Sequence, residues 1–298
     1  MQTMKIVLFC LCVSSAVLAS NFHFTRVDVP SGVDTFVLGI NARGDVVGFY
    51  DDKKGATHGF LLHRSTFLSI DFPGALSTLA RAINARGDIV GTSTDLAGVD
   101  HGYLLRDGRY TQIDVPEASA TIARGINNAG DITGNYKDSS CNESGFLLKN
   151  GRYYRVRVPN SCSTDVLMPM DDGRVLVGDF CTITDGALHG FLRNRSGQFQ
   201  TIDVPNAGRF ACTAPRWINE RGDIVGLYLI ANTSDECYGG SNEHGFLIRD
   251  GEYSTIDFPG AAITDVLGIN DDGELVGLYI DSSGLAHGFR AVPVKENN

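Results

Sequence analysis

Residues 82–116 read AINARGDIVGTSTDLAGVDHGYLLRDGRYTQIDVP. With local departures, this order of segments recurs six times: a strand-like stretch ending in I-N, a glycine turn, I-V-G, a variable loop, H-G-F-L-L, a tight turn and I-D-V-P. The closing prolines are Pro30, Pro73, Pro116, Pro159, Pro205 and Pro259, so the repeat spans 43 residues three times, then 46 and then 54. A period of about 40–45 residues with several short strands in each copy is typical of a β-propeller. The sequence therefore predicts an all-β, six-bladed β-propeller with four antiparallel strands per blade, here called a, b, c and d.

The turns between strands c and d predict which residues lie opposite each other. Dipeptides such as Asp107-Gly108 are favoured in two-residue hairpins, and this turn places His101 opposite Asp114. The same count pairs His58 with Asp71, His189 with Asp203, and His244 with Asp257. The third copy has Ser144 and Arg157 at these positions, so both members of the pair are lost together. Because the histidine–aspartate pair recurs in nearly every copy, we interpret it as a structural contact between strands c and d. The alternative is a set of general bases, each a histidine oriented by its carboxylate.

The two ends of the chain each hold part of one repeat. The last histidine motif, His287-Gly288-Phe289, has no strand d after it, and the first aspartate motif, Val27-Asp28-Val29-Pro30, has no strand c before it. Joining them completes a sixth blade and pairs His287 with Asp28. We therefore expect the N-terminal strand to close the ring. Whether the chain crosses between blades at the d–a or at the b–c connection is left open.

The N-terminus predicts export. Residues 1–19 contain Lys5, an apolar stretch and Ala19, as in a secretory signal peptide that is cleaved near Ala19 or Ser20. Residues 20–298 then form a single propeller domain, which we expect to be secreted, extracellular or periplasmic, and monomeric. No later segment is apolar enough for a membrane helix. The net charge of −10 and pI near 5.1 argue against a nucleic-acid partner.

Five cysteines follow the predicted cleavage site: Cys141, Cys162, Cys181, Cys212 and Cys237. Their spacing matches no zinc motif, and in an exported protein disulfides are expected. Cys162 nearly faces Cys181 across the a–b hairpin of the fourth blade, so the preferred pairing is Cys162–Cys181 with Cys212–Cys237, which leaves Cys141 free. The alternative is Cys141–Cys162 with Cys181–Cys212.

The G-I-N-x-x-G-x-I-V-G and H-G-F elements resemble the HAF repeat family of extracellular proteins, named after its His-Ala-Phe tripeptide. The likeness covers nearly all of residues 24–290, with Gly in the middle of His58-Gly59-Phe60 and Ser144 as a departure in the third blade. The resemblance implies export and a propeller-like repeat. It carries no established activity and no functional residues.

The copies differ most in the fourth and fifth blades, and function in a closed repeat is expected where the copies differ. Trp217 stands where Gly39, Gly125 and Gly268 stand in other copies. It is interpreted as a plug of the channel or, alternatively, as a stacking platform for a sugar. The fifth b–c loop is the longest and adds three candidate ligand contacts: Tyr238, Asp235 and Glu236.

The repeat holds no catalytic motif, so no catalytic residue and no cofactor is assigned. Acidic residues after strand b (Asp51, Asp95, Asp138 and Asp281) leave calcium as an alternative, although exposed turns favour the same residue. The leading expectation is a non-catalytic binding module for an extracellular carbohydrate or protein. One alternative is a propeller-type hydrolase or lyase with carboxylates or calcium at the channel mouth. Another is a purely structural envelope or matrix protein.

Overall fold

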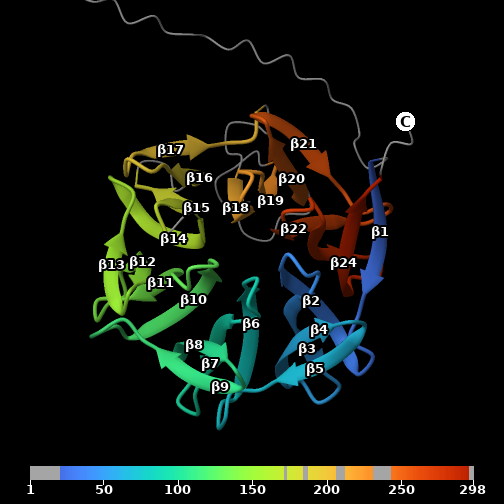
Figure 1. Ribbon diagram of the computed structural model, residues 1–298, viewed down its shortest axis with the longest axis horizontal. Helices are drawn as coiled ribbons and strands as arrows, with labels where there is room; N and C mark the ends of the chain where they lie inside the picture. Colours follow the sequence, from blue (N-terminus) through green and yellow to red (C-terminus); the bar gives the residue numbers. More distant parts are fainter. Residues whose placement is uncertain (1–20, 171–172, 184–186, 206–211, 231–242, 295–298) are drawn as a thin grey trace, which may run out of the picture.

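The computed structural model describes residues 21–170, 173–183, 187–205, 212–230 and 243–294. Its strands form six four-stranded antiparallel sheets, arranged as blades around a central channel (Figure 1). The predicted all-β, six-bladed propeller is therefore confirmed.

In blades 1 to 3 the strands follow the predicted order a, b, c, d. Blade 1 consists of β2 (Gly32–Ile40), β3 (Val46–Asp52), β4 (Thr57–His63) and β5 (Thr66–Ile70). Blade 2 consists of β6 (Ser77–Ile83), β7 (Ile89–Thr94), β8 (Asp100–Arg106) and β9 (Arg109–Ile113). Blade 3 consists of β10 (Ala120–Ile126), β11 (Ile132–Lys137), β12 (Glu143–Lys149) and β13 (Arg152–Val156).

The second half of the ring repeats this order, and its last blade takes its fourth strand from the N-terminus. Blade 4 consists of β14 (Ser161–Met170), β15 (Val175–Thr182), β16 (Leu188–Arg193) and β17 (Phe199–Ile202). Blade 5 consists of β18 (Cys212–Ile218), β19 (Ile224–Leu229), β20 (Glu243–Arg249) and β21 (Glu252–Ile256). Blade 6 consists of β22 (Ile263–Ile269), β23 (Leu275–Ile280), β24 (Ala286–Pro293) and β1 (Phe22–Val27).

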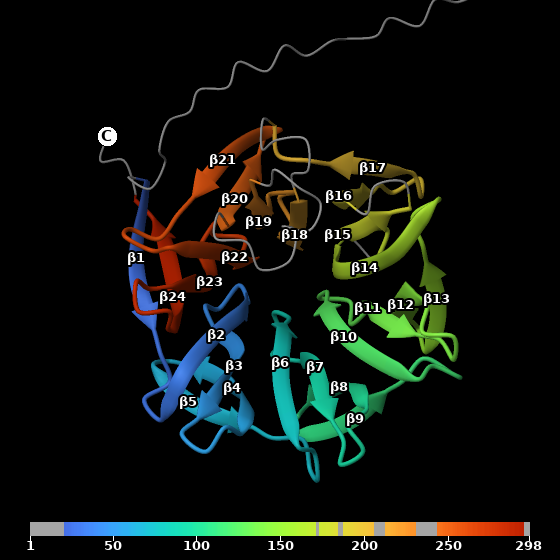
Figure 2. The same cartoon turned by 180° about the vertical axis from the view of Figure 1, so that it is seen from behind.

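Closure of the ring by the N-terminal strand is confirmed. β1 pairs antiparallel with β24 over its whole length, from Phe22 opposite Pro293 to Val27 opposite Gly288. Figure 2 shows the two strands side by side at the outer edge of blade 6, seen from behind. The pairing joins the two ends of the described chain through backbone hydrogen bonds, so the sheet of blade 6 is complete.

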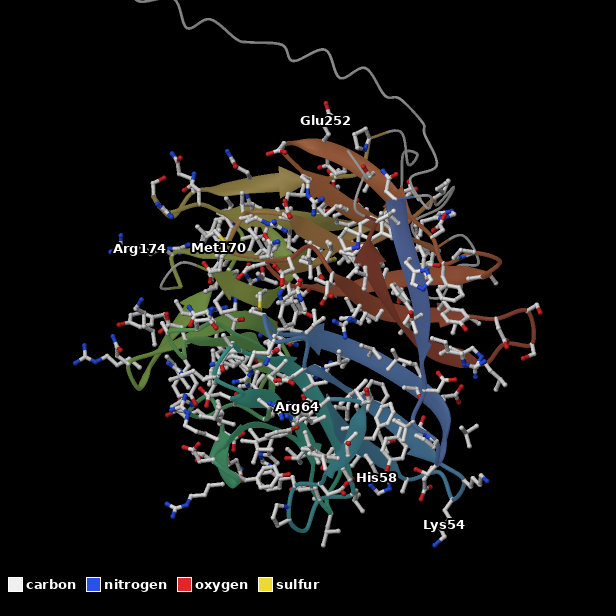
Figure 3. All side chains as sticks on the ribbon, turned by 45° about the vertical axis from the view of Figure 1, so that its right-hand side comes forward. Lys54, His58, Arg64, Met170, Arg174 and Glu252 are labelled. Carbon is white, nitrogen blue, oxygen red and sulfur yellow. A yellow bond between two sulfur atoms is a disulfide. The ribbon has the colours of Figure 1, made fainter. Side chains whose placement is uncertain are left out.

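The structure decides the connection that the sequence left open. The a strands lie nearest the channel, and each contacts the a strands of its two neighbours (Figure 1). The chain therefore crosses from one blade to the next at the d–a connection. The b–c turns lie with these crossings on one side, here called the variable face, and the a–b and c–d turns lie on the other, the plain face. In blade 1, Lys54 at the b–c turn and Arg64 at the c–d turn lie at opposite ends of the blade (Figure 3).

The core lies between the blades and is built around one aromatic residue from each c strand. These side chains are fully or almost fully buried: Phe60, Tyr103, Phe146, Phe191, Phe246 and Phe289. Each buried side chain of this size contributes about 1.5–3 kcal/mol relative to an exposed one. The aromatic ring packs directly against the glycine of I-V-G in strand b, where a larger residue would clash with it. A Cβ built on Gly91 would lie 1.9 Å from the carbonyl oxygen of Leu79 and 2.7 Å from the hydroxyl of Tyr103.

The predicted turns are present. Gly87 has φ of +91°, and each of the other five a–b turn glycines likewise has a positive φ. Asp107 and Gly108 have φ of +50° and +73°, as a type I′ hairpin requires, and Arg106 faces Arg109 as the register predicted.

A ladder of asparagine side chains joins the blades on the plain face. In Asn84, Oδ1 accepts hydrogen bonds from the backbone N–H groups of Arg86 and Asp88, both at 3.0 Å. Its Nδ2 donates to the Asp88 carboxylate at 3.0 Å and to the carbonyl oxygen of Asn127 in the next blade at 3.2 Å. The same bond between blades links Asn41 to Asn84, Asn219 to Asn270, and Asn270 to Asn41. Blade 4 has Met170 at this position, so the ladder stops there.

A disulfide joins Cys162 to Cys181 within blade 4, as preferred from the sequence. Cys141 carries a free, exposed thiol. The alternative of Cys141–Cys162 with Cys181–Cys212 is therefore wrong, because the a–b hairpin brings Cys162 and Cys181 together with a Cα separation of 5.3 Å. Cys212 is also disulfide-bonded, and its predicted partner Cys237 lies outside the described residues.

Candidate functional site

A cavity of about 200 Å³ occupies the central channel. Each a strand contributes one equivalent side chain to its wall: Leu38, Arg81, Arg124, Leu167, Arg216 and Leu267. Three guanidinium groups and three isobutyl groups thus lie in one layer around the channel. We call this layer the arginine–leucine ring.

A bulge in each a strand turns these side chains toward the channel. In blade 2, Ala80 pairs with Gly91 and Ala82 pairs with Val90, so Arg81 is an extra residue without a partner on β7. The register shifts at the equivalent place in all six a strands. Because a bulge re-aims the side chain of the extra residue, the backbone itself builds the ring.

The indole of Trp217 forms the floor of this cavity. A Cβ built on Gly39 in blade 1 would lie 3.1 Å from two carbons of the indole, so the ring of Trp217 reaches past blade 6 to blade 1. The side chain is 6% exposed. It also lines a smaller space of about 50 Å³ on the plain face, next to the asparagine ladder. Trp217 therefore separates the channel into two parts.

Two of the three arginines are paired with carboxylates of blade 4. Arg124 donates from Nη2 to Asp165 at 3.1 Å, and Arg216 donates from Nη1 to Asp179 at 3.0 Å. Asp165 and Asp179 lie opposite each other on β14 and β15. Arg81 differs, because its Nε donates to the hydroxyl of Thr92 at 2.9 Å and no carboxylate in the described part of the chain pairs with it.

Burial changes the protonation of the acids around the channel. Burial raises the pKa of Asp179 to about 7, although Arg216 opposes the shift. Burial and the neighbouring Glu243 carboxyl raise the pKa of Asp265 to about 8, and burial also raises the pKa of Glu243. The two carboxyl groups are close enough to influence each other, and a proton on one of them relieves the repulsion between two buried negative charges. Carboxyl groups that hold protons near neutral pH are the kind used for acid–base chemistry.

The predicted histidines and aspartates lie together at the outer c–d edge of the blades. The distances from histidine Nδ1 to the aspartate carboxylate are 2.7 Å for His58–Asp71, 3.0 Å for His101–Asp114 and His189–Asp203, and 3.1 Å for His244–Asp257 and His287–Asp28. In blade 3, Ser144 instead accepts a hydrogen bond from Arg155 at 3.0 Å. The Asp257 carboxylate raises the pKa of His244, and for His101 the Asp114 and Asp95 carboxylates outweigh burial and raise the pKa. None of these pairs lines the channel cavity.

The acidic residues that were considered for calcium are engaged in the b–c turns. Asp95 Oδ1 accepts the backbone N–H groups of Ala97 at 2.8 Å and Val99 at 2.9 Å, and Asp138 and Asp281 bind their own turns in the same way. In blade 1 this role belongs to Asp52, not to Asp51, which accepts a hydrogen bond from Thr57. No cluster of three or more metal-ligating side chains occurs in the described residues.

Of the four predicted ligand contacts, only Trp217 lies in the described part of the chain. Tyr238, Asp235 and Glu236 fall within residues 231–242, which lie outside it. The residues predicted from the sequence did not include Arg81, Arg124 and Arg216. Their signal was an arginine or leucine three residues before the asparagine of the turn, or before Met170 in blade 4, but the inward direction of these side chains depends on the bulge.

No helix among the described residues is long and apolar enough to cross a membrane. A scan against family models found no match, and no curated protein is significantly similar in sequence.

Solved structures share the fold at low sequence identity. Streptogramin B lyase is 13% identical with a TM-score of 0.50, over 93% of this chain and 100% of the lyase. The fucose-recognising lectin of Aleuria aurantia, a six-bladed β-propeller, is 10% identical with a TM-score of 0.54, over 90% of this chain and 100% of the lectin. AofleA of Arthrobotrys oligospora is 12% identical with a TM-score of 0.52, over 95% of each chain. At these identities the likeness is one of fold alone, and the chain shares the six-bladed β-propeller with the Aleuria aurantia lectin.

Proposed function

We propose that this protein is a secreted, non-catalytic binding module of the HAF repeat type that holds a carbohydrate in the channel cavity above Trp217. The observation that carries the proposal is the combination of an indole floor with the arginine–leucine ring. Sugars present hydroxyl groups beside C–H faces, so forked guanidinium donors and aromatic or aliphatic surface suit them together. A cavity of about 200 Å³ is small, which favours a single sugar unit at the end of a chain.

Two further observations support this proposal. The lectin of Aleuria aurantia recognises fucose on the same fold, which makes a sugar-binding propeller a reasonable precedent. The Cys162–Cys181 disulfide and the signal-like residues 1–19 favour a location outside the cytoplasm. The His–Asp pairs lie away from the cavity, and we assign them a structural role within the blades.

The test uses the single tryptophan of the sequence as the reporter. Mature protein is titrated with neutral and acidic mono- and oligosaccharides while Trp217 emission and the melting temperature are followed. A binding sugar changes the emission and, at 100 times its Kd, stabilises the protein by about 2.7 kcal/mol. Arg124→Met weakens this response, whereas Arg109→Met, at an exposed c–d turn, leaves it intact. A set of saccharides that changes neither signal contradicts the proposal.

A hydrolase or lyase is the second candidate, favoured by Asp265 at the cavity wall and the neighbouring Glu243, both with raised pKa values. One protonated and one ionised carboxyl could serve as acid and base. The same saccharides are incubated with the protein for long times and analysed for new reducing ends or unsaturated products. Product that disappears in Asp265→Asn would favour the enzyme over the binding module.

A further inference from the structure

We propose that the channel cavity selects a ligand with one carboxylate, such as a uronic acid unit, and that Arg81 binds this group. The inference rests on the proposed carbohydrate function and names the class of sugar. The three arginines of the ring are equivalent in the fold but not in their partners. Arg124 and Arg216 each bind an aspartate, whereas the Nη groups of Arg81 form no hydrogen bond with the described part of the protein.

Arg81 carries a positive charge that no carboxylate of the described residues pairs with. Its guanidinium is partly buried and lines the channel cavity. Burial together with the nearby Arg124 and Arg216 lowers its pKa to about 9, so it still carries its charge at neutral pH. Asp100 acts in the opposite direction on the pKa of Arg81, but no ion pair joins the two side chains among the described residues. An anion in the cavity would supply the missing partner.

The number and shape of the charges favour a carboxylate. Arg124 and Arg216 have their own aspartate partners, so Arg81 is the one guanidinium of the ring without a carboxylate partner among the described residues, and a ligand with a single carboxylate matches it. Asp265 also lines the cavity, but its pKa of about 8 keeps it protonated and uncharged near pH 7. A carboxylate also accepts two parallel hydrogen bonds from a guanidinium fork. The leucines of the ring and the indole of Trp217 provide apolar surface for the rest of the ligand. A sugar acid has both features, whereas a small inorganic anion has only the charge.

The experiment compares matched ligands by calorimetry at pH 7. Galacturonate and glucuronate, as monosaccharides and short oligosaccharides, are titrated beside galactose and glucose, and beside acetate and galactose 6-sulfate. We expect the uronates to bind at least 10-fold more tightly than their neutral counterparts. In Arg81→Met this preference disappears while neutral sugars bind as before. The variant also melts at the same or a higher temperature, because a charge without an ion-pair partner is removed. Arg109→Met keeps the preference.

The outcomes separate this inference from the proposed function. Equal affinity for uronates and neutral sugars overturns the carboxylate site and leaves sugar binding intact. A preference for uronates that persists in Arg81→Met also overturns the carboxylate site and leaves sugar binding intact. Tighter binding of galactose 6-sulfate than of galacturonate also overturns the carboxylate. If acetate binds as tightly as the uronates, the result supports an anion site at Arg81 but contradicts recognition of the sugar part of the ligand. No binding by any ligand overturns both proposals.

Discussion

His287, in the last strand, hydrogen-bonds through Nδ1 to the carboxylate of Asp28, 259 residues earlier, at 3.1 Å. Its Nε2 lies 3.2 Å from Asp281, so one imidazole bridges the two carboxylates. This side chain is 5% exposed, whereas that of His101 in blade 2 is 26% exposed. The contact at the closure of the ring is therefore the more buried of these two pairs.

Asp28→Ala is expected to destabilise the protein by about 2 kcal/mol, because it leaves Nδ1 of the buried His287 imidazole without its partner. The matched change Asp114→Ala removes the partner of a more exposed histidine and is expected to cost less than about 1 kcal/mol. Urea unfolding of both variants measures the difference. Equal losses would show that the closure pair contributes no more than the others.

Gly91→Ala is expected to cost about 3 kcal/mol, since the added methyl group forces strands a and b apart or displaces Tyr103. Gly98→Ala serves as the control. Its Cβ meets no atom within 4 Å, but its φ is +81°, so a cost of about 1 kcal/mol is expected from the backbone alone. Thermal unfolding compares them, and a Gly91→Ala variant as stable as Gly98→Ala would contradict the close approach.

Asn84→Ala removes four hydrogen bonds of the ladder, one of them to the next blade. We expect a loss of about 2–4 kcal/mol, because buried backbone groups lose their partners. Asn128→Ala, next to the ladder, removes one exposed hydrogen bond to the backbone of Ala85 and should cost less than about 1 kcal/mol. Urea unfolding measures both, and similar losses would show that the ladder is dispensable.

Trp217→Gly restores the residue found at positions 39, 125 and 268 and joins the two parts of the channel. The loss of a buried indole is expected to cost about 3–5 kcal/mol. Leu96→Ala, where the leucine is 79% exposed, should change stability by less than about 0.5 kcal/mol. Before any substitution, weak quenching of Trp217 emission by iodide would be consistent with its burial. Strong quenching would contradict the plug.

Stability should decrease as the pH rises from about 5 to 8. Asp179 and Asp265 have folded-state pKa values of about 7 and 8, above the ordinary value of 3.8, so the native state holds protons that the unfolded state has released. For each group, every pH unit between the unfolded-state pKa and the folded-state pKa costs about 1.4 kcal/mol. His101 and His244, whose pKa values are also raised, act in the same direction as the pH passes through their folded pKa values.

Asp265→Asn is expected to flatten this pH dependence, measured as the melting temperature at each pH. Asp107→Asn, in an exposed hairpin turn that asparagine also suits, should keep the wild-type slope. If the slope of melting temperature against pH is unchanged in Asp265→Asn, groups other than Asp265 hold the protons that the native state retains.

The sequence by itself determined the number of blades, the four strands of each blade and the closure by residues 22–27. It did so because the period, the two-residue turn and the alternation of side chains are local properties. The position of Asp107-Gly108 alone predicts that His101 faces Asp114. The disulfide Cys162–Cys181 followed from the same kind of count across the a–b hairpin.

Only the tertiary structure decided what faces the channel and what joins the blades. Arg81 belongs to the candidate site because a bulge turns it inward, and a bulge leaves little trace in the sequence. The bond from Asn84 to Asn127 and the approach of Trp217 to Gly39 join residues of different blades. Such contacts depend on how the blades pack around the axis, which no local pattern encodes. The candidate site was missed for this physical reason, since it is formed by one residue from each of six separate strands.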